Sequence, residues 1–283
     1  MSVRPVAVPG IFRRMTAPEM PPLPPLPAPS ADAPRGAWGC RATVGLGLLA
    51  TVLLVGAQAV VAFVFAITMV VRSYAADGKN LASSEVSARL LSDPLMLSLS
   101  VLVGLPVVLG GVWLAIKLRK GYPFPEYLNW RGFGIGQFIL WAAILVVVMA
   151  GGGWLVERTG DKSGEAFVQG MTSSGEFTLL LSLAMALGAP IQEEVLFRGF
   201  MFRGIAESRA GWVAAILIPN IFWTSLHVQY AWQTMLVIFA MGIVLGLARR
   251  FSHSVALPMT LHILWNAWVT FTATSGLSAA GAP

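Results

Sequence analysis

Residues 43–71 read TVGLGLLATVLLVGAQAVVAFVFAITMVV, and the run contains no Asp, Glu, Lys or Arg. About 20 consecutive apolar residues are enough for a helix to cross the hydrocarbon core of a bilayer. A helix on the surface of a soluble protein would carry polar residues along one face at helical spacing, and this run lacks them. The stretch therefore predicts a transmembrane helix, and with it a membrane protein.

The rest of the chain repeats this pattern. Its 283 residues have a mean hydropathy of +0.73, and only 11% of them are charged. Successive uncharged runs predict an all-α, polytopic transmembrane helical bundle of about seven spans. We divide them into N-terminal membrane helices in residues 42–176 and a second transmembrane core in residues 177–273. The predicted spans are residues 43–71, 95–116, 135–156, 177–203, 211–227, 231–248 and 256–273.

Basic residues are distributed unevenly among the predicted loops. If the N-terminus is cytoplasmic, 14 of the 19 Lys and Arg residues fall on the inner side, and the five outer residues are Arg72, Lys79, Arg89, Arg158 and Lys162. Such an excess is typical of cytoplasmic loops, so the pattern predicts a cytoplasmic N-terminus. Topology then explains the net charge of +6, and no nucleic-acid partner is expected. The predicted location is the plasma (inner) membrane, with lipid as a partner.

The first 41 residues hold ten of the 18 prolines, including PPLPPLPAP at 21–29. Proline at this density prevents helix formation and favours polyproline II. We predict a disordered, proline-rich cytoplasmic tail over residues 1–41. The alternative is that this tail binds a partner domain that recognises proline-rich peptides. Cys40, the single cysteine, cannot form an intrachain disulfide and is either palmitoylated or an unmodified thiol.

Charged residues interrupt the fourth predicted span in the sequence IQEEVLFRGFMF, residues 191–202. A charged side chain at the bilayer centre costs roughly 2.5–3.5 kcal/mol on insertion scales. Arg198 follows Glu194 by four residues on the same helical face, and its guanidinium can bind a carboxylate through two parallel hydrogen bonds. We therefore expect Arg198 to neutralise Glu194 and Glu193 to remain available for acid–base chemistry. The alternative is an ion pair that only anchors the helix at the membrane interface.

Two of the three histidines also lie in apolar spans. His227 follows Trp223 by four residues, and His262 precedes Asn266 by four, so each pair shares a helical face. A lone histidine in an apolar helix is usually a packed core residue. Several polar side chains in a medium without water must find one another, however, and this predicts that these residues meet the glutamates around one polar cavity.

Carboxylate, imidazole and amide groups around a water molecule are suited to hydrolysis. A glutamate can take a proton from water, and amide or imidazole donors can stabilise an oxyanion. The alternative is Zn²⁺ held by His227, His262 and Glu193. No two of these share the i, i+4 spacing that preforms a helical zinc site, which favours a reaction without an obligatory metal. The HExxH, GxSG and GxGD motifs of other membrane proteases are not present.

The motifs together resemble those of the CPBP intramembrane protease family, which includes CAAX prenyl endopeptidases and bacteriocin-processing or immunity proteins. The resemblance rests on Glu193-Glu194-x-x-x-Arg198, on an aromatic residue four positions before His227, and on His262-x-x-x-Asn266. It covers about residues 177–268. The second motif usually has Phe where this chain has Trp223, and a packing role is expected there.

The resemblance implies an all-helical core with a conical cavity. It assigns Glu193 and His227 to water activation. It assigns His262 and Asn266 to oxyanion stabilisation or, in keeping with the family's metalloprotease label, to metal binding. A membrane-associated peptide or protein is the implied substrate.

The sequence therefore predicts an intramembrane endopeptidase. The alternative is a non-catalytic immunity or scaffold protein that keeps the family's polar core for stability. A proton-coupled transporter could use buried carboxylates as a relay, but it fits poorly because the sequence shows no internal repeat.

Overall fold

The structure is a computed structural model that describes residues 36–78, 80–119, 122–172 and 178–275. All regular elements in these ranges are helices, so the predicted all-α class is confirmed. The proline-rich tail predicted for residues 1–41 lies outside the described residues up to position 35, and the first helix begins at Cys40.

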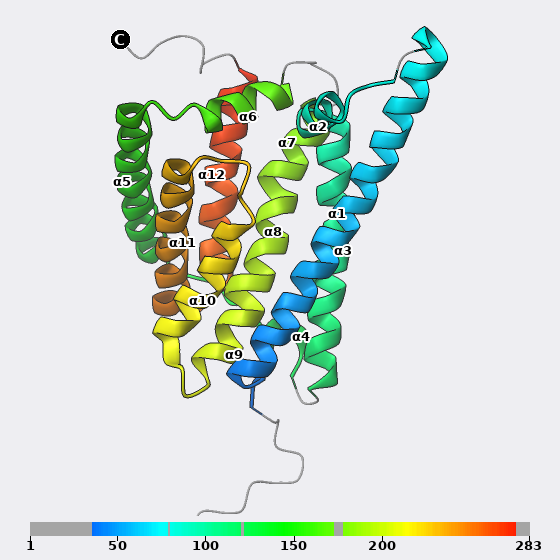
Figure 1. The fold of residues 1–283 in the computed structure, drawn as a ribbon. Helices are drawn as coiled ribbons and strands as arrows, with labels where there is room; N and C mark the ends of the chain where they lie inside the picture. The colour runs from blue at the N-terminus through cyan, green and yellow to red at the C-terminus, as the bar shows by residue number, and fades with distance from the viewer. Residues whose placement is uncertain (1–35, 79, 120–121, 173–177, 276–283) are drawn as a thin grey trace, which may run out of the picture. The chain divides into compact units, whose positions relative to one another are not determined.

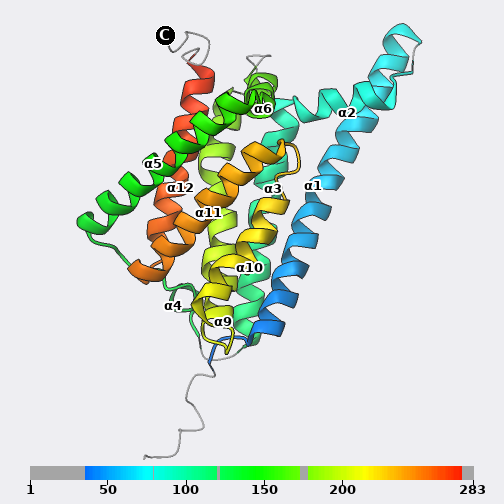
Figure 2. The same cartoon turned by 60° about the vertical axis from the view of Figure 1, so that its left-hand side comes forward.

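The helices are α1 Cys40–Asp77, α2 Ser83–Leu91, α3 Pro94–Leu118, α4 Phe124–Tyr127, α5 Ile135–Thr159, α6 Ser163–Thr172, α7 Thr178–Leu183, η1 Ala184–Gly188, α8 Ala189–Glu193, η2 Glu194–Met201, α9 Phe202–Ala206, α10 Gly211–Ser225, α11 Trp232–Ser252 and α12 Ala256–Thr274. The elements η1 and η2 are π-helical. In both views of the fold, α1 and α3 lie on one side of the α7–α9 run, and α5 and α11 lie on the other (Figures 1 and 2).

Each of the seven predicted spans coincides with one helix or with a run of consecutive helices. Five segments are long and apolar enough to cross a membrane, namely Cys40–Ala76, Pro94–Leu118, Ile135–Thr159, Leu179–Ala206 and Trp232–Ser252. Helix α10 is apolar but has only 15 residues, and α12 has 19 residues but contains the polar His262 and Asn266. The predicted count of about seven is consistent with these five spans and two further helices.

The predicted loops are more helical than the sequence indicated. The polar stretch 72–93 contains the end of α1 and all of α2, and α6 lies between the third and fourth spans. The segment 117–134 carries both basic and aromatic residues, a combination typical of the headgroup layer. Its Tyr127 is nevertheless fully buried, and its ring stacks on that of Phe200 at a centroid distance of 5.7 Å.

The helix that carries the acidic motif changes hydrogen-bond register around Pro190. The amide of Ala189 donates to the carbonyl of Ala184, five residues earlier, as in a π-helix. The next donor in this register would be residue 190, but proline has no N–H. The carbonyl of Met185 is therefore left without a partner in its own helix. The structure thus accommodates the proline, for which the sequence predicts a kink, by a local change of helix type.

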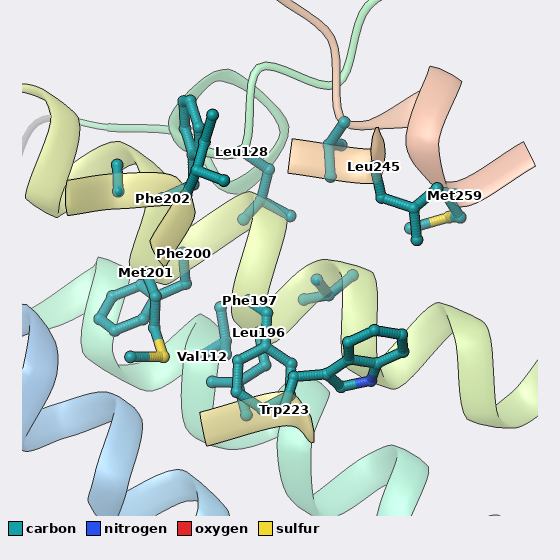
Figure 3. Close-up of a cluster of buried hydrophobic side chains, with 14 of the residues drawn as sticks. Val112, Leu128, Leu196, Phe197, Phe200, Met201, Phe202, Trp223, Leu245 and Met259 are labelled. Carbon is teal, nitrogen blue, oxygen red and sulfur yellow. The ribbon is translucent and has the colours of Figure 1, made fainter. Parts of the chain in front are cut away.

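Helices α10 and α11 approach closely where α11 has glycines. A β-carbon at Gly242 would overlap Asn220 and Trp223, and one at Gly246 would crowd Ile216. This close contact is the role that four-residue spacing of small residues predicts in a membrane bundle. Trp223, which is 2% exposed, belongs to a large cluster of buried apolar side chains (Figure 3).

A hydrogen-bonded loop contact fixes the start of α11. The Asp161 carboxylate accepts from the amide of Thr234 at 3.2 Å and from its hydroxyl at 2.6 Å, and it also accepts from the amide of Ser163 at 2.8 Å. The Ser163 hydroxyl in turn accepts from the amide of Ala231 at 2.9 Å. Because no side chain of its own caps α11, Asp161 satisfies first-turn donors of this helix from a distant loop.

These hydrogen bonds, led by the one from Thr234, lower the pKa of Asp161 to about 2 from its ordinary 3.8. A carboxyl group whose pKa falls on folding stabilises the fold above the unfolded pKa, and the contribution is lost as the pH falls towards 2. We expect the thermal midpoint of the wild type to drop between about pH 4 and pH 2 more than that of Asp161→Asn, measured in one detergent. Glu165→Gln, which removes an exposed ion pair with Lys162 in the first turn of α6, is the control and should keep the wild-type pH profile.

Candidate active site

Glu194 and Arg198 form a buried ion pair at the centre of the motif. Their side chains are 0% and 4% exposed, and Nη1 of Arg198 lies 3.0 Å from Oε1 of Glu194. This confirms the predicted pairing. The two parallel hydrogen bonds expected from the sequence do not form. Oε1 accepts from both Arg198 and Nδ1 of His262, the latter at 3.0 Å, and Oε2 has no partner among the described atoms.

Arg198 is held on all sides. Its Nη2 donates to the carbonyl of Gly242 at 3.4 Å, and its guanidinium lies 4.4 Å from the centroid of the Trp223 ring. A cation over an indole face is stabilised by the ring quadrupole, most strongly where water is excluded. In addition, the backbone carbonyl of Arg198 accepts from Nε of Arg249 at 2.9 Å. The arginine therefore joins α11, α10 and the motif helix at one point.

Glu193 occupies a different environment from its neighbour. Its side chain is 18% exposed, compared with 0% for Glu194. Its Oε2 accepts from the indole N–H of Trp223 at 2.6 Å and lies 3.9 Å from Nε2 of His262. Two adjacent carboxylates are thus distinguished as the sequence predicts, with one neutralised by arginine and the other accessible beside an imidazole.

The imidazole of His262 lies between the two carboxylates. An ionised carboxylate can only accept hydrogen bonds, so we assign a proton to Nδ1, which faces Glu194. Nε2 consequently faces Glu193. Since the ring is only 3% exposed, Glu194 fixes both its tautomer and its orientation.

His227 is placed differently from the prediction. Helix α10 ends at Ser225, so His227 lies in the following loop, where its Nδ1 is 2.9 Å from the carbonyl of Trp223. Its ring stacks on Tyr230 at a centroid distance of 6.2 Å and meets Trp223 edge-on at 5.1 Å. Within the described part of the chain, no hydrogen bond joins His227 to Glu193, which is contacted by Trp223 instead.

Asn266 shares a helix face with His262 but contacts another element. Its Nδ2 donates at 3.0 Å to the carbonyl of Met185, the carbonyl that the Pro190 ring leaves without a helical donor. One amide hydrogen is therefore used to hold α12 against η1, and the second remains for another acceptor.

Asn266 also lines a small pocket formed by residues of α6, α7, η1 and α12 together with Tyr230. The pocket has a volume of about 100 Å³, and its walls are largely apolar, formed by residues that include Phe167, Leu181, Met185, Tyr230 and Val269. Burial raises the pKa of Tyr230 to about 12, and the Glu193 carboxylate acts in the same direction. Tyr230 is therefore a neutral phenol at physiological pH, which can donate a hydrogen bond at the edge of the pocket.

The predicted zinc ligands His227, His262 and Glu193 do not form a metal site in this arrangement. No three His, Cys, Asp or Glu side chains in the described segments lie close enough together to hold a metal ion. Nδ1 of His262 contacts Glu194 and Nδ1 of His227 contacts a backbone carbonyl, which leaves Nε2 of each ring, but these nitrogens and Glu193 do not form a cluster that could hold a metal ion. The donors present do not fit a three-ligand zinc centre.

Residues 175–268 match the Rce1-like family of type II CAAX prenyl endopeptidases. The Rce1-like segment covers about a third of the chain and confirms the family resemblance inferred from the motifs. All six predicted site residues fall inside it, namely Glu193, Glu194, Arg198, His227, His262 and Asn266.

An uncharacterised 24.3 kDa protein of Escherichia coli is 33% identical over 88 residues, which is 30% of this chain and 40% of that relative. The alignment thus spans less than half of the relative's length. No solved structure matches the chain.

Trp223 has a polar role in the site that was not predicted from the sequence. Packing was expected at this position, where the family usually has Phe. The signal was present in the residue type, because Trp has an N–H donor that Phe lacks, and a buried indole N–H usually finds an acceptor. Here the acceptor is Glu193, while the ring face covers Arg198.

We expect Arg198→Ala to lower the free energy of unfolding by about 3–5 kcal/mol, because it leaves the Glu194 carboxylate buried without a counter-ion. Arg89→Ala, which breaks an exposed i, i+4 pair with Glu85, should cost at most about 1 kcal/mol. Chemical unfolding in a single detergent measures both.

A double variant tests whether the uncompensated Glu194 charge causes the loss of stability. Adding Glu194→Gln to Arg198→Ala removes the uncompensated charge and should restore part of the stability. Arg203→Ala would be a poorer control than Arg89→Ala, because Arg203 pairs with Glu207 and also donates to the carbonyls of Glu126 and Tyr127. Equal losses in Arg198→Ala and Arg89→Ala would contradict this account of the buried pair.

Proposed function

We propose that the chain is an intramembrane endopeptidase that hydrolyses a peptide bond of a membrane-associated substrate with water activated by Glu193. The observation that carries the proposal is the contrast between the two carboxylates. Arg198 and His262 hold Glu194 in a buried position, whereas Glu193 is partly exposed and lies 3.9 Å from the imidazole. The match of residues 175–268 to the Rce1-like family supports this class of reaction.

In this mechanism Glu193 is the general base. A water molecule bound by its carboxylate loses a proton to it as the oxygen attacks the substrate carbonyl carbon. The Trp223 indole N–H holds the carboxylate in place, and Nε2 of His262 accepts the second hydrogen of the water and orients it. The proton on Glu193 then passes to the departing amine as the C–N bond breaks.

This assignment gives His262, rather than His227, the place beside the catalytic glutamate. His227 is expected to act through the aromatic wall formed with Trp223 and Tyr230. Asn266 is the proposed oxyanion donor, through the amide hydrogen that the Met185 carbonyl does not use. The adjacent pocket of about 100 Å³ would hold an apolar substrate side chain next to the scissile bond.

Glu193→Gln should abolish cleavage of membrane-proximal peptides by the purified protein. The amide keeps the size of the side chain and can still accept from Trp223, but it cannot take a proton, and loss of a general base costs roughly 10²–10⁴-fold. Glu207→Gln, at an exposed carboxylate near the end of the same helix run, should retain full activity. Far-UV circular dichroism checks that both variants are folded.

Further arms of this experiment separate the mechanisms. Asn266→Ala should lower the turnover number by about 10²-fold, as loss of an oxyanion donor does elsewhere. Chelation followed by dialysis should leave activity intact. Stoichiometric zinc with activity lost on its removal and restored on its return would instead support a metalloprotease. Cleavage by neither wild type nor variants would favour the non-catalytic scaffold.

We also propose that the end of the bundle where α1 begins faces the cytoplasm. The basic residues cluster at this end, where α3, α9 and α11 end and α5 and α10 begin (Figure 1). Those within the described residues are Arg41, Lys117, Arg119, Arg131, Arg203, Arg209, Arg249 and Arg250. Such an excess is typical of cytoplasmic faces.

Single cysteines at Ser83 and Tyr122, introduced into a Cys40→Ser background, should be labelled from opposite sides of the membrane. Ser83 begins α2, whereas Tyr122 lies before α4 at the other end of the bundle. A membrane-impermeant maleimide applied to intact cells should label the Ser83→Cys variant alone. Labelling of both variants, or of Tyr122→Cys alone, would reject this orientation.

A further inference from the structure

A second cavity lies at the basic end of the bundle, and neither Glu193 nor Glu194 lines it. It has a volume of about 300 Å³ and is formed by α9, the start of α10 and the end of α11. Its lining includes Arg203, Arg249 and Arg250, with Glu207 as the carboxylate among the lining residues. The proposed hydrolytic mechanism uses none of these side chains.

Positive charge exceeds negative charge in this cavity. Arg203 is paired with Glu207 at 2.7 Å, but in the described part of the chain no carboxylate pairs with Arg249 or Arg250. Arg249 is only 2% exposed, and its Nε donates to the carbonyl of Arg198. A buried guanidinium is costly unless an anion compensates it, so the cavity is short of negative charge.

The backbone also contributes positive electrostatic potential to the cavity. Helix α10 begins at Gly211, which lines the cavity, and has neither a side-chain cap nor an acidic residue in its first turn. The N–H of Gly211 donates to the carbonyl of Ser208, but the following N–H groups of the first turn and the positive end of the helix dipole are available to an anion. Arginine side chains and a helix N-terminus converging on one cavity are the donor set that binds phosphate.

The surroundings favour a phosphate carried by a lipid. Trp212 lines the cavity and is 41% exposed, and the Arg250 guanidinium lies 5.8 Å from its ring centroid. Phe251, next in sequence, is 56% exposed. Exposed aromatic and basic residues at the end of a membrane helix are typical of the headgroup layer. A cavity of about 300 Å³ also has room for more than one phosphate ion.

We propose that this cavity binds a phosphate group, supplied by the headgroup of an anionic phospholipid or as free phosphate, through Arg249, Arg250 and the N-terminus of α10. Binding fixes Arg249, whose Nε contacts the carbonyl of Arg198 in η2. An occupied cavity consequently stabilises the helix that carries the Glu194–Arg198 pair. The site does not depend on whether the chain is a protease.

The test uses the full-length protein in a neutral detergent. Its thermal midpoint is measured with increasing phosphatidylglycerol, with phosphatidylcholine and with inorganic phosphate. We expect phosphatidylglycerol to raise the midpoint and phosphatidylcholine to leave it unchanged, because only the former carries net negative charge. A comparable rise with inorganic phosphate would identify a soluble phosphate as the source, and its absence would identify the lipid.

Matched arginine variants locate the site. Arg250→Gln should weaken the apparent affinity about tenfold or more, because it removes charge-assisted hydrogen bonds. Arg209→Gln removes the same charge from an exposed position at the same end but outside the cavity, and should keep the wild-type response. Arg249→Gln should also lose the response, and Arg250→Lys should retain part of it.

The proposal is overturned if the two lipids act alike and phosphate has no effect. It is also overturned if the effect of phosphatidylglycerol survives in both Arg249→Gln and Arg250→Gln, or if Arg209→Gln loses it to the same extent as Arg250→Gln. The last result would mean diffuse attraction to the basic end of the bundle.

Discussion

The buried ion pair between Glu194 and Arg198 is the constraint on which the site depends. A charge taken out of water is costly unless it is paired and further hydrogen-bonded. Arg198 meets this requirement through Glu194, the Gly242 carbonyl and the Trp223 ring, which lie on three helices, whereas Oε2 of Glu194 has no partner among the described atoms. The same carboxylate also fixes His262. Because the pair neutralises one glutamate, the neighbouring one can remain accessible at low cost.

The ion pair at the centre of the site could be predicted because it follows from local spacing. A residue pair four apart on a helix shares a face, and this placed Arg198 against Glu194. Long uncharged runs likewise located the membrane helices, since the bilayer leaves few alternatives for an apolar segment of that length. The position of His262 beside the glutamates followed from the need of buried polar groups for partners.

The remaining features depend on tertiary contacts that no spacing rule reports. His227 was expected on a helix, but α10 ends before it, and its ring packs on Tyr230. The hydrogen bond from Trp223 to Glu193 depends on how α10 packs against the motif helix, and Trp223 is also in close contact with Gly242 of α11. Asp161 fixes a helix that begins about 70 residues later. Each of these contacts joins segments that are distant in the sequence.

The π-helical segments on either side of Pro190 also determine which way the acidic motif faces. A π-helical turn holds one more residue than an α-helical turn, so it acts as an insertion in the angular register of the helix. Removing one residue from η1 would rotate everything after it by about 100° relative to what precedes it, since an α-helix has 3.6 residues per turn. The direction of Glu193 is therefore encoded partly in the length of the chain before it, as well as in its own identity.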